Sequence, residues 1–274
     1  MSAGSSGSSA PGVAPWVRCT RRPIEGRTIV HVELTRSEKR NALTVDMLGA
    51  LVSAVDAAAC DDAVDAIVLS GLPGSCFCAG FDLRQCAADA SILPKLLAGL
   101  SEAIRAMRRA PMPVVIAAHG KGGAIAGGCA LLGGADMVVA SSDLTLGYPV
   151  VRLGISPAVS APFLVAGAGA GPARERMLDP SLTDAADAKR IGLVHEIVDD
   201  APGGAAAGSR TIERALRLAA ELGAKPRAGT RATKRFLNEV DGTSDAERID
   251  RGLRASLAIV GNPEERERLA AMWS

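Results

Sequence analysis

The sequence predicts an α/β protein built on a sheet whose strands are buried on both faces. Between residues 28 and 160, strand-like and helix-like segments alternate along the chain. The strand-like segments are short apolar runs without polar alternation, which is typical of parallel strands covered on both sides. Hydrophobic residues make up 48% of the chain but aromatic residues only 3%, so we expect a core of closely packed Ala, Val, Leu and Ile.

The first elements are a strand, a helix and a second strand. Residues 28–34 form a β-rich run. Thr44 then precedes a segment with apolar residues at helical spacing, so we expect it to cap a helix. Residues 66–70 are a short apolar run that Gly71 ends, which predicts a buried strand.

The pattern continues with a second helix and two further strands. An amphipathic helix is expected over residues 94–109, with its proline in the first turn. Residues 113–118 read as a buried strand, followed by a glycine-rich turn at 120–128. Residues 129–135 are expected to be helical, and residues 137–140 to form a strand.

A change in composition marks the C-terminal part. Residues 203–208 are Gly and Ala only, which predicts a loop and a boundary near residue 205. Beyond it, residues 210–222, 229–238 and 245–257 have the pattern of charged, amphipathic helices.

We expect the chain to divide into a disordered tail (1–14), a core (15–205) and a helical C-terminal region (206–274). The tail has neither a basic segment nor an apolar run, so it does not read as a secretory signal. The stretch 153–173 lacks charges, but its three prolines favour a buried turn and helix over a membrane span. We expect a cytoplasmic protein with no membrane span.

Charge and cysteine content exclude several classes. Lys and Arg number 31 and Asp and Glu 30, and this balance argues against a nucleic-acid binder. The six cysteines form no disulfide or zinc framework, so we expect reduced, structural thiols. No two of the three histidines stand three or four residues apart, so no metal site is predicted.

Two glycine-rich turns are the candidate chemical centre, at residues 76–83 and 120–128. Glycine lets the backbone turn tightly and lets a ligand approach the amides. Two such turns at the ends of neighbouring strands could direct two N–H donors at one oxygen, as in an oxyanion hole. Phosphate-loop, dinucleotide and nucleophile-elbow spacings all fail, because Lys121 precedes Gly122 and no GxGxxG or GxSxG is present.

Several ordered motifs carry a resemblance to a known family. They are Ser37-Glu-Lys-Arg-Asn-Ala-Leu43, Phe77-Cys-Ala-Gly-Phe-Asp-Leu83, Gly-x-Ala-x-x-Gly-Gly at 122–128, Asp136-Met-Val-Val-Ala140, Gly154-Ile-Ser-Pro157 and Ile191-Gly-Leu-Val194. In this order and spacing they resemble the enoyl-CoA hydratase/isomerase (crotonase) superfamily over about residues 25–260.

The resemblance implies a ββα spiral fold, with C-terminal helices that complete homotrimers or hexamers. It also implies an acyl-CoA thioester whose carbonyl oxygen is held by two backbone amides, here those of Phe81 and Gly127. No cofactor beyond the CoA moiety of the substrate is implied. The CoA path would be lined by residues of two segments: Lys39, Arg40, Ala42, Ala79, Gly80, Asp82 and Leu83. We expect Asp82 to brace its turn through local amides.

The chain departs from the family at its two acid/base positions. One family glutamate stands three residues after the second oxyanion glycine, where this chain has Ala130. The other follows the proline of a Gly-x-Pro-Glu stretch, where this chain has Val150. Neither side chain can transfer a proton, and loss of each general acid/base should slow water addition by about 10² to 10⁴.

Three residues are candidate replacements for the proton carriers: Tyr148, His119 and Arg152. Each also has a structural interpretation, in packing, at a strand end or in an ion pair. The sequence leaves two main hypotheses open. One is a family enzyme with altered or weak proton transfer; the other is a non-catalytic protein that sequesters or senses acyl-CoA. A peptidase of related fold is disfavoured, because no Ser/His/Asp arrangement accompanies the turns.

Overall fold

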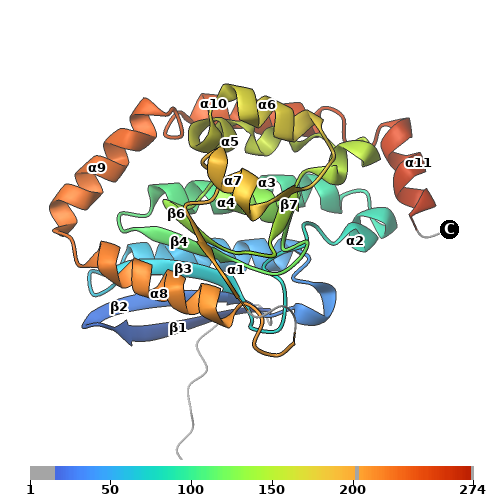
Figure 1. Cartoon of the computed structure of the whole chain (residues 1–274). Coiled ribbons are helices and arrows are strands. Elements are labelled where there is room, and N and C mark those ends of the chain that lie inside the picture. Colours follow the sequence, from blue (N-terminus) through green and yellow to red (C-terminus); the bar gives the residue numbers. More distant parts are fainter. Residues whose placement is uncertain (1–15, 201–203, 273–274) are drawn as a thin grey trace, which may run out of the picture.

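The computed structural model describes residues 16–200 and 204–272, so the predicted tail at 1–14 lies outside the described residues. A six-stranded sheet in the order β1-β2-β3-β4-β6-β9 forms the centre (Figure 1). The strands are β1 (Val17–Ile24), β2 (Arg27–Leu34), β3 (Ala66–Gly71), β4 (Val114–Ala118), β6 (Met137–Ser141) and β9 (Glu196–Val198). β1 and β2 pair antiparallel, and all other neighbours in this sheet pair parallel.

Helices cover both faces of this sheet. The core on one face includes residues of α1 (Val45–Ala59), α3 (Ile92–Arg109) and α4 (Gly127–Leu132). The core on the other face is formed with α8 (Ser209–Gly223). Every residue of β3 and β4 is buried, as expected for parallel strands between two layers. The predicted α/β class is confirmed.

Local sequence signals account for the helix ends. Thr44 caps α1 as predicted, with its Oγ1 accepting a hydrogen bond from the Met47 amide at 3.2 Å. Helix α3 begins at Ile92, two residues before the predicted start, and ends at Arg109, two residues before Pro111. Helix α4 begins at Gly127 rather than at the predicted Cys129, because its first turn grows directly out of the glycine turn.

A smaller sheet and a group of short helices lie beside the main sheet. The three strands, which the sequence pattern did not indicate, are β5 (Ala124–Ile125), β7 (Thr145–Gly147) and β8 (Thr183–Asp184). The short helices are η1 (Ser37–Lys39), α2 (Leu83–Ala88), η2 (Pro149–Leu153), η3 (Pro157–Ser160), α5 (Ala161–Ala168), α6 (Ala170–Leu178) and α7 (Ala185–Arg190). The uncharged stretch at 153–173 therefore forms a turn and helices, as expected. None of the helices in the described ranges is both long and apolar enough to span a bilayer.

The C-terminal region adds α9 (Arg227–Val240), α10 (Ala246–Leu257) and α11 (Pro263–Ala271), the last not anticipated from the sequence. Helix α10 packs against α3 and η3, and α11 packs against α2 and η2. These contacts bring α11 next to α2, the helix that follows the first glycine turn.

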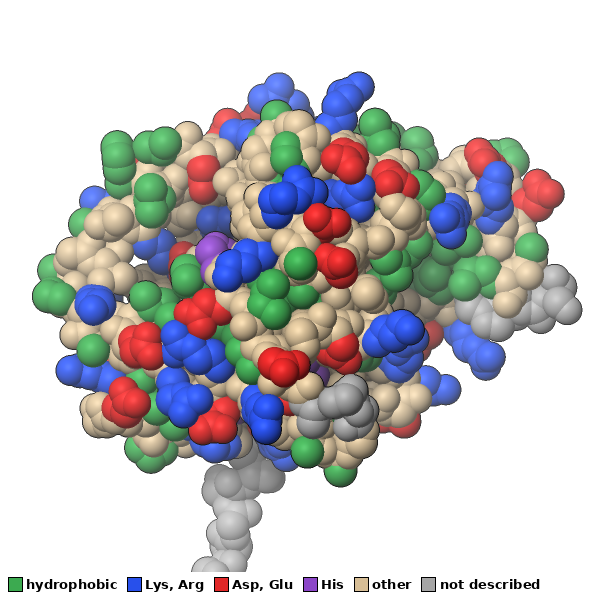
Figure 2. Space-filling model, in the orientation of Figure 1, with side chains coloured by type: hydrophobic (Ala, Val, Ile, Leu, Met, Phe, Trp, Pro, Cys, Tyr) green, Lys and Arg blue, Asp and Glu red, His purple; other side chains and the backbone are tan. Residues whose placement is uncertain are grey.

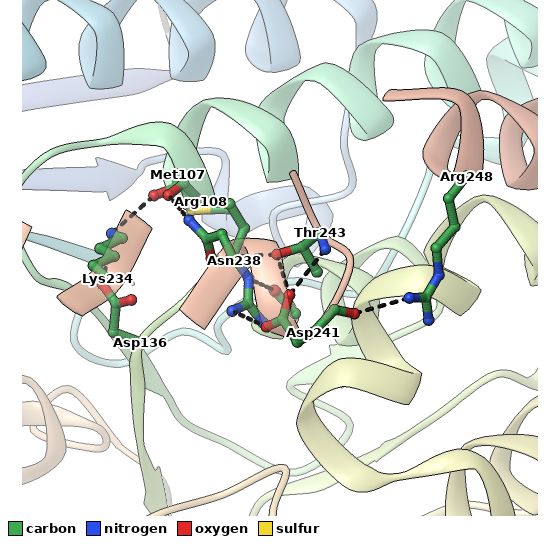
Figure 3. A network of polar contacts seen from close by, with 9 residues as sticks. Met107, Arg108, Asp136, Lys234, Asn238, Asp241, Thr243 and Arg248 are labelled. Carbon is green, nitrogen blue, oxygen red and sulfur yellow. Dashed lines mark hydrogen bonds and ion pairs between the residues drawn. The ribbon is translucent and has the colours of Figure 1, made fainter. Parts of the chain in front are cut away.

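Helix α9 is attached to the body through buried polar contacts, which we call the α9 anchor (Figure 3). The Lys234 Nζ donates to the carbonyl oxygens of Met107 and Met112, at 3.2 and 3.0 Å, and to the Asp136 carboxylate at 2.7 Å. Asn238 donates to a carbonyl oxygen in the last turn of α3 at 2.9 Å. The carbonyls of Met107 and Arg108 belong to the last turn of α3, so the anchor also caps this helix.

Beyond the anchor, α9 stands away from the body. A groove of about 810 Å³ separates it from the layer below. Phe236, Leu237 and Val240 of this helix expose more than half of their surface. Helix α9 lies at the left of Figure 1, and Figure 2, in the same orientation, shows hydrophobic side chains on that side. The predicted role of residues 206–274 in oligomerisation stays a prediction.

Candidate active site

The two glycine turns predicted to carry the chemistry lie against each other. The Cys78 amide donates to the carbonyl oxygen of Gly123 at 2.6 Å, and the Ile125 amide donates to that of Cys78 at 3.1 Å. The first turn is held from its other side, since the Leu43 amide donates to the Gly80 carbonyl oxygen at 2.7 Å. Three segments far apart in sequence therefore meet at this point.

Phe81 and Gly127 occupy neighbouring positions on these turns. A Cβ at Gly80 would lie 3.7 Å from the Gly127 amide nitrogen, and a Cβ at Gly127 would lie 3.1 Å from the Phe81 ring. Within the described residues, neither the Phe81 amide nor the Gly127 amide donates to any acceptor. Two free N–H groups thus occur on adjacent segments, and both residues line the same pocket.

The link between the second turn and α4 is strained. Ala126 has φ +50° and ψ −108°, a combination that side-chain-bearing residues rarely adopt. The Ala126 amide donates to the Gly147 carbonyl oxygen at 2.7 Å, which fixes the residue from one side. This conformation sets the direction in which the chain enters α4, and therefore the direction of the Gly127 amide.

The pocket beside these amides is apolar and small. Its cavity of about 20 Å³ is lined by Phe81, Leu97, Leu100, Ala126, Gly127, Ala130, Tyr148, Val150, Ile155, Ser156, Pro157, Val159 and Ser160. Ala130 and Val150, which the resemblance led us to expect at the acid/base positions, both lie in this lining. No described residue that lines the pocket carries a carboxylate, an imidazole or a cationic group.

Two buried carboxylates near the pocket are already occupied. Asp82 forms an ion pair with Arg36 at 2.7 Å, with both side chains largely buried. The expectation that Asp82 braces its turn through local amides is therefore wrong, because a strand-end arginine far away in sequence holds its carboxylate. Glu265 of α11 accepts from the Gly261 amide at 3.2 Å and lies against Gly154, and burial raises the pKa of this carboxyl.

Tyr148 differs from the other polar residues near the pocket. It is 2% exposed, and its hydroxyl has no hydrogen-bond partner among the described residues. Cys129 and Ser160 lie near the phenol without hydrogen-bonding geometry, and Ser160 donates its own proton to the Pro157 carbonyl oxygen at 2.8 Å. Burial raises the pKa of Tyr148 well above its usual value, so the phenol stays protonated.

The other two candidate proton carriers do not line the pocket. The His119 ring packs against Gly208, and its two nitrogens lack hydrogen-bond partners in the described chain. Burial lowers the pKa of His119, so it is neutral. Arg152 is exposed on η2 and is not among the described residues that line this pocket. Tyr148 is the candidate that the fold brings beside the two amides.

The segments expected to line the CoA path run side by side. The Ala79 amide donates to the Arg40 carbonyl oxygen at 3.0 Å, and Lys39 is exposed beside it. Ala42 and Leu83 are half-buried and Gly80 is buried. The Arg40 guanidinium donates to the carbonyl oxygens of residues 121 and 122, at 3.1 and 3.2 Å, and so ties this loop to the second turn.

Cys78 of the first turn and Cys129, just after the second, are both buried. Burial raises the pKa of both Cys78 and Cys129 to about 12, so each is a thiol at neutral pH. Among the described residues, no three His, Cys, Asp or Glu side chains are grouped so that they could hold a metal ion.

Several residues that shape the site were not found from the sequence. Leu97 and Leu100 of α3 form part of the pocket wall, and Arg36 holds Asp82. Asn41, in a left-handed conformation with φ +53°, donates to the carbonyl oxygens of Cys76 and Phe77. The asparagine at a turn was a usable signal. Leu97 and Leu100 gave no such signal, because their i, i+3 spacing is typical of any buried helix face.

Comparison with known proteins identifies the family of this chain. Residues 25–254 match the family model described as enoyl-CoA hydratase/isomerase. A protein of Thermus thermophilus, provisionally described as an enoyl-CoA hydratase, is 32% identical over 250 residues, covering 89% of this chain and 91% of that protein. A Mycobacterium tuberculosis protein, named (7aS)-7a-methyl-1,5-dioxo-2,3,5,6,7,7a-hexahydro-1H-indene-carboxyl-CoA hydrolase, is 30% identical over 219 residues, covering 78% and 83%.

The fold has close structural relatives. The crystal structure of an enoyl-CoA hydratase/isomerase from Xanthobacter autotrophicus Py2 superposes with a TM-score of 0.80 at 27% identity, covering 93% of this chain and 92% of that one. The predicted crotonase fold with C-terminal helices is thereby confirmed. The chain belongs to the enoyl-CoA hydratase/isomerase family.

Proposed function

We propose that the protein binds an acyl-CoA thioester and polarises its carbonyl oxygen with the amides of Phe81 and Gly127. The observation that carries this proposal is the pair of unpartnered N–H groups on adjacent turns beside one pocket. A thioester enolate bears a negative charge on that oxygen, so the two donors act where charge develops in the reaction. Each such donor is typically worth about 10² to 10³ in rate.

The proton-transfer step differs from that of a two-glutamate hydratase. Ala130 and Val150 line the pocket where the family pattern has glutamates, and neither can carry a proton. Asp82 and Glu265 have other partners. We therefore propose an acyl-CoA enzyme of the hydratase/isomerase type with altered or weak acid/base chemistry. The Mycobacterium tuberculosis relative supports this proposal, because its name describes a hydrolase, which is not a hydratase activity.

The CoA moiety follows the two adjacent loops. Lys39 is the exposed cation placed to meet a CoA phosphate, whereas Arg40 positions the second turn through its carbonyl contacts. Ala42, Ala79 and Leu83 offer small or apolar walls to the pantetheine, and no further cofactor is required. We also propose a cytoplasmic homotrimer or hexamer, in which the exposed apolar residues of α9 are covered.

The test is calorimetric titration of the full chain with acetyl-, crotonyl- and long-chain acyl-CoA, followed by turnover assays with each ester that binds. We expect saturable binding of at least one ester and weaker binding of free CoA. Absence of binding by every ester would refute the proposal.

The double variant Ala130→Glu/Val150→Glu tests the missing proton carriers, and it should raise the rate of crotonyl-CoA hydration by about 10² to 10⁴. Circular dichroism checks that this variant is folded.

A second candidate function is non-catalytic binding of acyl-CoA. It is favoured by the pocket lining, whose single titratable side chain among the described residues is the protonated Tyr148. The two functions separate in the turnover assay. Binding of an ester with no conversion of any acyl-CoA in the panel would establish the second and exclude the first.

A further inference from the structure

Tyr148 lines the pocket beside the two amides, and its buried hydroxyl has no hydrogen-bond partner within the described residues. Its side chain is 2% exposed and lies in the same lining as Phe81, Gly127 and Ala130. Buried hydroxyls in folded proteins nearly always have a partner. This one has none among the described residues, although its surroundings include Ser160. Ser160 gives its own proton to a backbone carbonyl, so it is not a donor to any ligand.

The rest of the pocket cannot bind a charged group. Apart from Tyr148 and the serines at 156 and 160, its side chains are apolar, among them Leu97, Leu100 and Val150, and the described lining contains no cation. The Ser156 hydroxyl accepts a hydrogen bond from the Ala158 amide at 3.2 Å. A carboxylate on the acyl chain would therefore be buried without a counter-ion, which is strongly unfavourable. The cavity is also small, about 20 Å³, so a short acyl group fits with least displacement of the walls.

We infer that Tyr148 selects short, uncharged acyl groups that carry a hydrogen-bond-accepting oxygen, such as a keto group, in addition to the thioester. The inference rests on the proposed function, because it assigns a specificity to the same acyl pocket. The phenol supplies the hydrogen bond and the apolar walls supply the remaining contact. An acyl group without this oxygen leaves the hydroxyl unpaired, and sites of this kind discriminate strongly against such analogues.

Tyr148 serves as a donor rather than as a base. Burial raises the pKa of this phenol, so it retains its proton over the neutral range. The preference for the keto ester should therefore not change between pH 6 and pH 8.

The experiment compares pairs of esters that differ in one oxygen. Calorimetry of the full chain is carried out with butyryl-CoA against 3-oxobutyryl-CoA, and with pentanoyl-CoA against 4-oxopentanoyl-CoA. We expect the wild type to bind at least one keto ester about 10- to 100-fold more tightly than its partner. Tyr148→Phe should abolish that preference by weakening the binding of the keto ester about 10- to 100-fold. Succinyl-CoA should bind more weakly than butyryl-CoA.

A matched control separates the pocket hydroxyl from other buried hydroxyls. Ser101 on α3 is also buried and unpartnered among the described residues, but it does not line the pocket. Ser101→Ala should keep the wild-type preference. Equal binding within both pairs, or a keto preference that survives in Tyr148→Phe, would overturn the inference while the proposed function stands. Failure of every ester to bind would overturn both.

Discussion

The α9 anchor and the acyl pocket both bury polar groups, but they treat them in opposite ways. In the anchor, Lys234 uses all three of its protons, on two carbonyl oxygens and the Asp136 carboxylate (Figure 3). In the pocket, the amides of Phe81 and Gly127 and the Tyr148 hydroxyl have no partner among the described residues. Because an unpaired buried polar group is costly, this contrast separates a structural contact from the site that we propose for the ligand.

The largest expected effect on stability comes from removing the Lys234 contacts of the α9 anchor. Lys234→Ala leaves the Asp136 carboxylate and the carbonyl oxygens of Met107 and Met112 without their donor, and removing one partner of a buried pair typically costs about 3 kcal/mol or more. Urea unfolding should show this loss, whereas Lys189→Ala at an exposed position should change stability little. If Lys234→Ala unfolds at the same urea concentration as the wild type, the α9 anchor does not stabilise the fold, and the contrast between anchor and pocket is wrong.

The next effect comes from pushing the two glycine turns apart. A Cβ at Gly128 would lie 2.2 Å from the Cys78 carbonyl oxygen, a backbone atom that can move only with its turn. Gly128→Ala should cost about 2 kcal/mol and weaken acyl-CoA binding severely. The control is Gly49→Ala on α1, where nothing lies within 4 Å and the helix should gain about 1 kcal/mol. Normal ester binding by Gly128→Ala would contradict the assigned site.

An unpartnered polar atom outside the pocket should reduce stability in acid. His31 is buried, its Nε2 contacts the Ser70 hydroxyl at 2.8 Å, and its Nδ1 has no partner among the described residues. Burial lowers the pKa of His31 from 6.5 to about 4. Below pH 6.5 the unfolded chain therefore binds the proton more readily, and stability falls until about pH 4. Between pH 7 and pH 5 the loss should be about 2 kcal/mol.

Chemical denaturation at a series of pH values measures this slope. His31→Gln should flatten it by the amount attributed to His31, even if the variant is less stable throughout. His119 and His195 contribute in the same direction, because burial lowers the pKa of each. An unchanged slope in His31→Gln would show that these other groups dominate acid unfolding.

The smallest effect is the sharpest test of the comparison. Thr243 beside the anchor donates to the Asp241 carboxylate at 2.6 Å, whereas Tyr148 donates to nothing in the described chain. Thr243→Val should therefore cost about 1 kcal/mol, and Tyr148→Phe should be neutral or slightly stabilising. Thermal unfolding of the two variants measures the difference. A loss of stability in Tyr148→Phe as large as that in Thr243→Val would mean that the phenol is bonded within the folded chain.

Much of the fold could be predicted because it follows from local patterns. The apolar runs at 66–70, 113–118 and 137–140 became β3, β4 and β6 with ends shifted by at most one residue. The helical periodicity beyond residue 209 gave α8, α9 and α10. The strands β5, β7 and β8 have two or three residues each, too few for a periodicity to show.

The candidate site could be predicted only where glycine or motif order marked it. Phe81, Gly127, Ala130, Val150 and Tyr148 do line one pocket. His119 and Arg152 were equally plausible from sequence, but strand direction turns His119 toward Gly208 and leaves Arg152 exposed. The partners of Asp82 and Arg40 are set by contacts between distant segments, which no local pattern encodes.

The torsion at Ala126 has a consequence for how a ligand is received. A residue with φ +50° and ψ −108° costs about 1 to 3 kcal/mol, and this energy is drawn from the stability of the whole fold. The donor at position 127 is thus preorganised before any thioester arrives. A thioester can then bind with little rearrangement of this turn. Differences in affinity between esters should therefore appear mainly in their dissociation rates.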